Sequence, residues 1–109
     1  MKQYLSPEQT AKLIELGFEK PKNEVKAEQA GDYAWYNPAY SIGELIEMLP
    51  RVISNKKFDY ATINIFHDTI NWVVGYVDTN DIMRFITSDI EFIDALCTMC
   101  RKLKEEGVI

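Results

Sequence analysis

The chain has 109 residues, of which 47% are hydrophobic and 27% are charged, and its formal net charge is −5. These values exclude an intrinsically disordered chain and predict one globular domain over residues 1–109. The acidic balance argues against a surface that binds an extended phosphate backbone, so nucleic acid is not an expected partner.

Helix signals begin near the N-terminus. Ser6-Pro7-Glu8-Gln9 combines an N-cap, a proline at the first helical position and a capping-box partner, and Gly17-Phe18 provides a stop signal. These signals predict a helix over about residues 7–16. The segment 19–31 is polar and contains Pro21, so we expect a mobile connecting loop or a short frayed helix there.

The middle of the chain begins with a group of aromatic residues. Residues 32–36 predict a short strand that ends at Asn37-Pro38. Ser41 and Glu44 form a second capping box, and Tyr40 and Leu45 can form a hydrophobic staple. Apolar residues then follow at helical spacing up to Pro50, which predicts a one-sided helix over residues 42–49.

Three later segments predict an antiparallel meander. Residues 58–66 alternate between apolar and more polar positions, and residues 70–77 and 82–86 follow after turn signals. Both sides of the segment 70–77 are apolar, with Trp72, Val74 and Tyr76 on one side and Val73 and Val77 on the other. We therefore expect a central strand that is covered on both faces.

The C-terminal segment predicts one long helix. Ser88 and Glu91 have the spacing of a capping box, and Gly107 and Val108 can close the other end in a Schellman-type turn. The predicted fold class is therefore α+β: a small antiparallel β-meander packed against a long C-terminal helix and two shorter N-terminal helices. We expect those two helices at the edge of the sheet or on its other face.

Cys97 and Cys100 form a Cys-x-x-Cys pair in the second half of this helix. A redox pair works at a helix start, where the dipole stabilises the thiolate, whereas this position raises the thiol pKa. Structural zinc needs four ligands, and His67 is the only histidine. We expect structural cysteines, with Cys100 in the core, and no metal or cofactor. Cys97 and Ile90 lie on the flank of the apolar stripe, where we expect a second contact.

His67-Asp68 is the other candidate for catalysis, because an imidazole beside a carboxylate can act as a general base. The sequence places no nucleophile beside the pair, and the two residues fit a solvated turn. An enzyme is thus disfavoured, although the sequence leaves this open.

Aromatic residues are the candidate binding residues. Tyrosine and tryptophan suit interfaces because they combine large area with a polar group. The candidates are Tyr33, Trp35, Tyr36, Tyr40, Trp72 and Tyr76. Two interpretations remain open: core packing, or a partly exposed surface that binds a protein partner or a second copy. An alternative is a binder of small ligands or single-stranded nucleic acid that combines an aromatic sheet face with loop residues such as Lys20, Lys22 and Arg51.

The sequence predicts neither a secretory signal nor a membrane span. Residues 1–10 contain no secretory signal, and the longest apolar run, at residues 72–77, is far shorter than the roughly 20 residues of a membrane span. Two cysteines in such a chain indicate free thiols in a reducing compartment. We expect a cytoplasmic protein without membrane contact.

Three stretches also resemble a known group. The stretches Leu5–Thr10 with Leu16–Phe18, Tyr40–Leu45 with Leu49–Pro50, and Asp94–Leu96 with Leu103–Ile109 are similar to short uncharacterised proteins of gut Bacteroidales and their prophages. The similarity covers the three expected helices and not the sheet. It implies a phage or mobile-element context and an intracellular address. No activity is assigned to that group, so the resemblance implies no catalytic or binding residue.

Overall fold

The computed structural model describes residues 2–22, 24–28, 34–55 and 59–109, and the side chains of residues 23–37 and 55 lie outside the description. Its elements, in chain order, are α1 (Pro7–Glu15), β1 (Glu24–Glu28), β2 (Ala34–Pro38), α2 (Ile42–Met48), β3 (Val52–Asn55), β4 (Asp59–His67), β5 (Trp72–Asp78), β6 (Met83–Asp89) and α3 (Phe92–Glu105). Strands β3 to β6 form an antiparallel sheet in sequence order, and β1 pairs with β2 separately. The fold class is α+β, as predicted.

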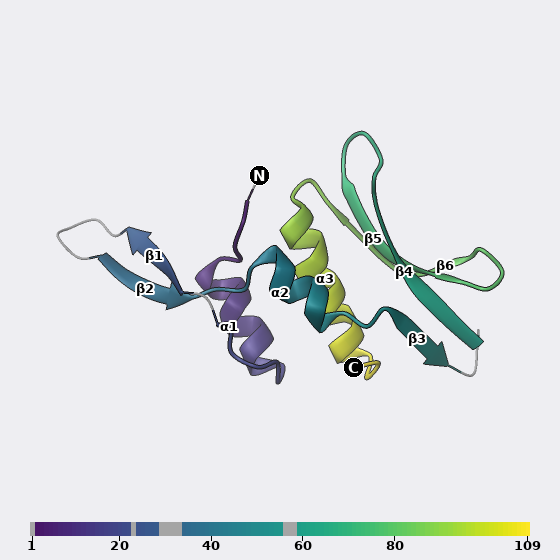
Figure 1. Ribbon diagram of the computed structural model, residues 1–109, viewed down its shortest axis with the longest axis horizontal. Helices are drawn as coiled ribbons and strands as arrows, with labels where there is room; N and C mark the ends of the chain where they lie inside the picture. Colours follow the sequence, from purple (N-terminus) through teal and green to yellow (C-terminus); the bar gives the residue numbers. More distant parts are fainter. Residues whose placement is uncertain (1, 23, 29–33, 56–58) are drawn as a thin grey trace.

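All three helices lie on one side of the four-stranded sheet (Figure 1). Helix α3 packs on β5 and β6, and α2 and α1 contact α3 rather than the sheet. The β1–β2 pair extends away from the helices, and the molecule measures 56 × 32 × 17 Å. The expectation that the short helices could cover the other face of the sheet is therefore wrong.

The first two helices begin as their sequences predict. The Ser6 hydroxyl accepts from the Gln9 amide, and the Gln9 side chain accepts from the Ser6 amide. Ser41 and Glu44 form the same reciprocal pair at the start of α2. These caps satisfy amides that the helix itself leaves unpaired, so local sequence suffices to set both starting points.

Helix α3 begins later than predicted. Ser88 belongs to β6, where it pairs with Val73, and the N-cap of α3 is Glu91, which makes no side-chain cap hydrogen bond. Pairing in the sheet thus prevails over the capping signal. Asp89 instead accepts from the Glu91 amide at 3.0 Å and turns the chain into the helix. The C-terminal closure is confirmed, since the Val108 amide donates to the Leu103 carbonyl at 2.8 Å.

The strands differ from the prediction in four respects. β3 adds a fourth strand that was not predicted, and β6 reaches Asp89. The loop predicted over 19–31 contains strand β1, and residues 23 and 29–31 lie outside the described residues. β5 is an inner strand, as expected, but helices cover only one of its faces.

The core lies between the sheet and the two short helices, with α3 at its centre. Buried residues occur on two sides of α3: Ile93, Ala95, Leu96, Cys97, Met99, Cys100 and Leu103. The Thr87 hydroxyl in β6 donates to the Ala95 carbonyl at 3.0 Å, and Cys100 contacts the Leu45 carbonyl in α2. Helix α3 is therefore buried from both sides and forms a middle layer between the sheet and the two short helices.

Candidate functional site

Two of the predicted binding residues are core residues. Tyr40 is 1% exposed and Tyr76 is 0% exposed, so neither contributes to a surface. The Tyr76 hydroxyl donates to the Pro50 carbonyl at 2.7 Å, and the Tyr40 hydroxyl donates to the Glu19 carbonyl. Burial raises the pKa of both phenols, to about 12 for Tyr40. Their polar groups anchor loops to the core, which corrects their assignment to an aromatic surface.

The other aromatic residues predicted to bind a partner do not form a site among the residues that the structure describes. Trp72 is half-buried, with its ring 4.8 Å from Phe92 of α3 and 5.0 Å from His67. Trp35 and Tyr36 belong to β2, and their side chains lie outside the described residues, as does Tyr33 altogether. Trp72 therefore helps to seat α3 on the sheet.

Both cysteines are free and buried. Burial raises the pKa of Cys97 to about 11 and of Cys100 to about 12, so both are thiols near neutral pH. Cys97, which was expected on the flank of the apolar stripe, is 3% exposed, whereas Ile90 on the same flank is 71% exposed. The N-terminal segment meets α3 one turn before Cys97, where Lys2 and Gln9 both donate to Asp94 at 2.8 Å. Among the described residues, no group of three His, Cys, Asp or Glu side chains could hold a metal ion.

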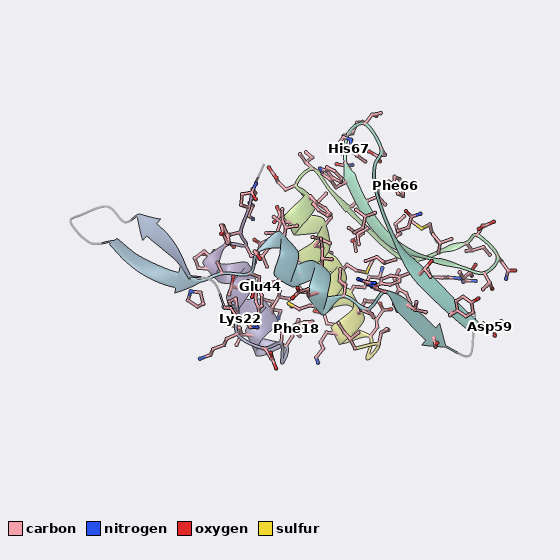
Figure 2. All side chains as sticks on the ribbon, in the orientation of Figure 1. Phe18, Lys22, Glu44, Asp59, Phe66 and His67 are labelled. Atoms are coloured by element: carbon pink, nitrogen blue, oxygen red, sulfur yellow. The ribbon has the colours of Figure 1, made fainter. Side chains whose placement is uncertain are left out.

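His67 and Asp68 both serve the β4–β5 turn. Asp68 accepts from the Asn71 amide at 2.6 Å and from the Ile70 amide at 3.1 Å, and these bonds lower its pKa. The His67 ring accepts from the Thr69 amide through Nδ1. The pair therefore holds a tight turn at the exposed end of β4, where Figure 2 labels His67.

The described basic side chains do not cluster on the sheet. Lys22 lies near α2, where its amide donates to Glu44 at 3.0 Å, and Figure 2 shows both near Phe18 and far from Phe66. The Lys104 ammonium lies 5.4 Å from the centre of the Phe18 ring. The lysine cluster required by the nucleic-acid alternative is thus absent from the described strands of the sheet.

The side of the sheet opposite α3 is open, and we call it the uncovered face. Strand alternation places there Val52, Ser54, Tyr60, Thr62, Asn64, Phe66, Val73, Gly75, Val77, Met83, Ile86 and Ser88. None of these residues is charged. Tyr60 and Ile86 are each 52% exposed and Phe66 is 42% exposed. Met83 lies over Gly75, where an added Cβ would come within 2.5 Å of its Cε atom.

A second open feature lies between α2 and the outer edge of β4, and we call it the β4 groove. Its volume is about 600 Å³, and it is lined by Ile46, Glu47, Leu49, Arg51, Val52, Thr62, Ile63 and Ile65. β3 covers only the first half of this edge, because its pairing ends at Val52 opposite Thr62. One further bond joins the Ile63 amide to the Arg51 carbonyl at 3.0 Å.

Sequence reasoning missed both surfaces. The alternation in β4 separates Tyr60 and Phe66 from the core-facing Ile63 and Ile65, which was the signal available for the uncovered face. Nothing local marks the β4 groove, because its walls come from segments about 15 residues apart that meet only in the fold.

Comparisons with known proteins add no family: no protein-family model, no curated protein and no solved structure matches the chain. Among the described helices, none is long and apolar enough to cross a membrane. The two open surfaces of the sheet are therefore the features from which a function can be argued.

Proposed function

We propose that this protein is a non-enzymatic accessory protein that acts by binding other protein chains, and that its uncovered face binds a second copy of itself. The observation that carries the proposal is the uncharged, partly apolar character of that face, with Tyr60, Phe66 and Ile86 exposed on it. Large apolar side chains exposed on one uncharged sheet face favour a protein partner.

Charge and size favour a second copy as the occupant. The chain carries a net charge of −5, yet the uncovered face contributes no charge, so two such faces meet without direct repulsion. Four strands at about 4.8 Å spacing and about 23 Å length give a projected area of roughly 450 Å² per copy. Two copies together bury roughly 900 Å², and the uneven surface of the side chains adds to this area. An interface of this size suits a weak and reversible dimer near the lower limit of specific interfaces.

The remaining parts of the proposal have separate support. The buried thiols and the turn role of His67 and Asp68 support a non-enzymatic protein. The two free cysteines support a cytoplasmic address, and the resemblance of the three helices supports a phage or mobile-element origin. The absence of charge from the uncovered face favours protein over nucleic acid, whose backbone requires cations.

The matched pair Ile86→Glu and Ile82→Glu tests the proposal. Ile86 is 52% exposed on the uncovered face, whereas Ile82 is 48% exposed and pairs with Asp78 on the other side. Sedimentation velocity from about 1 μM to 1 mM should show a dimer for the wild type and for Ile82→Glu, and a monomer for Ile86→Glu. A wild type that stays monomeric throughout, or equal association of both variants, would refute self-association through this face.

A further inference from the structure

We propose that the β4 groove binds an extended segment of a partner protein, which adds a strand to the outer edge of β4 and places alternate apolar side chains between β4 and α2. This surface shares Val52 and Thr62 with the uncovered face, but it lies mainly along the outer edge and helix side of β4 and takes a different occupant. Its evidence is also separate, since it rests on the backbone edge of β4 and on the shape of the groove rather than on the open side of the sheet.

The backbone of β4 provides the first argument. The Ile63 amide points toward β3, because it donates to the Arg51 carbonyl. In an antiparallel strand every second residue directs its amide and carbonyl to the same neighbour, so Ile65 and His67 point to this side as well. Asp68 is consistent with this alternation, because its amide points to the opposite side and donates to the Asn71 carbonyl across the β4–β5 turn. Among the described residues, no backbone group on the outer edge pairs with Ile65 or His67.

The other edges of the sheet are less suited to a new strand. β6 carries a bulge between the positions opposite Val74 and Tyr76, with Phe85 at φ 49°, which interrupts a straight ladder. β3 has only four residues. The second half of β4 is regular in its pairing with β5 and is not protected by a bulge, a proline or a lysine among its described residues.

The groove explains why the occupant is an apolar strand rather than a solvated loop. Ile63 and Ile65 face the helix side of the sheet, and Ile46 of α2 faces them with 41% of its surface exposed. A strand paired with Ile65 would direct every second side chain into the groove, whose volume of about 600 Å³ is typical of binding pockets. Backbone pairing then provides affinity, and the groove selects apolar side chains.

Charge at the rim specifies the ends of the segment. Glu47 lies on the α2 wall and Arg51 at the β3 end, and neither forms an ion pair within the described part of the chain. A segment with a basic residue toward Glu47 and an acidic residue toward Arg51 is therefore complementary. A second copy could use the same edge only by adding its own unpaired strand there, and the test below separates that outcome.

Selection from a phage-displayed library of random 12-residue peptides tests the proposal, with Ile46→Glu as the blocked groove and Ile82→Glu as the matched control. Both isoleucines are similarly exposed, and glutamate preserves helix propensity in α2. We expect selected peptides with apolar residues at every second position. The best synthetic peptide should bind Ile46→Glu at least tenfold more weakly than the wild type and bind Ile82→Glu unchanged.

Hydrogen exchange then locates the peptide. Saturation should slow exchange of the Ile65 and His67 amides about tenfold or more, and N-methylation of alternate peptide amides should abolish binding. Failure to enrich any peptide over Ile46→Glu, or equal binding to both variants, would overturn the proposal. Protection of Ile65 and His67 that rises with protein concentration without peptide would also overturn it, because a second copy would then occupy the edge.

Discussion

Alkaline pH offers a direct test of the buried thiols. In the unfolded chain each cysteine has its ordinary pKa of 9.0, whereas burial in the folded chain raises the pKa to about 11 for Cys97 and about 12 for Cys100. A raised pKa means that the native state holds the proton longer than the unfolded state. The associated stability is complete below about pH 9 and is lost progressively as the pH rises toward the folded values.

The size of this loss follows from the window between the two pKa values. At pH 10, one unit above the unfolded value, each thiol reduces the free energy of unfolding by about 1.4 kcal/mol. Together the two thiols lower the free energy of unfolding by about 3 kcal/mol at this pH. The total free energy of unfolding of a domain of this kind is roughly 5–15 kcal/mol. Tyr40 and Tyr76 add to the loss only at higher pH, because their ordinary pKa is 10.0.

Urea unfolding of the wild type and of Cys100→Ala, each at about pH 8 and pH 10 with a reductant present, isolates the contribution of one thiol. The variant should be about 1–2 kcal/mol less stable at pH 8, because it loses buried sulfur contacts. Between the two pH values it should lose about 1.4 kcal/mol less than the wild type. Equal losses would show that the Cys100 thiol is solvated in the native state, and rapid alkylation of the folded protein near pH 7.5 would contradict its burial independently.

Three further predictions concern the helix caps, an ion pair and the sheet. Ser6→Ala should lower the free energy of unfolding by about 1 kcal/mol in urea titrations, whereas Ser88→Ala should change it by less than about 0.5 kcal/mol, because Ser6 caps a helix and Ser88 does not. Burial raises the pKa of Asp94, but hydrogen bonds from the N-terminal segment lower it more. Asp94→Asn should therefore cost about 1 kcal/mol at pH 7. The difference should shrink as the pH falls below about 4, because the carboxyl group of the unfolded chain is then protonated while the native one, with its lowered pKa, is still ionised. Gly75→Ala should destabilise the wild type by about 1 kcal/mol and be neutral or stabilising in a Met83→Ala background, because only Met83 crowds the new Cβ within 3.4 Å.

Local sequence signals predicted the helix starts correctly where residues close in the sequence satisfy each other's hydrogen-bonding groups. The capping boxes of Ser6 and Ser41 depend on contacts three residues apart, and both formed as predicted. The same pattern at Ser88 failed because Ser88 had a competing partner, Val73, on a neighbouring strand. A short stretch of sequence shows the capping partner but not the partner on a distant strand. Capping patterns therefore predict helix starts too readily where the same residues can pair in a sheet.

Long-range signals were weaker for the same reason. Residues 52–55 form a strand only because β4 lies beside them, and four residues carry too little alternation to be recognised alone. Alternation in β4 and β5 separates two faces correctly, yet it does not say which face the helices cover. Tyr76 and Phe66 are both aromatic strand residues, and only the position of α3 makes one a core residue and the other an exposed one.

The two proposed surfaces meet at Val52 and Thr62 but use different groups, because a strand directs its backbone groups within the plane of the sheet and its side chains above and below it. The uncovered face uses side chains such as Phe66 and Ile86, which point away from α3. The β4 groove uses the in-plane backbone of Ile65 and the helix-side wall at Ile46. A dimer formed through the uncovered face therefore leaves the Ile65 backbone and the Ile46 wall of each groove open, and two weak sites held together in this way would bind a partner with two suitable segments more tightly than either site alone. Ile86→Glu should consequently weaken capture of a bivalent peptide while leaving the affinity for the single peptide unchanged, which links the two surfaces without requiring contact between them.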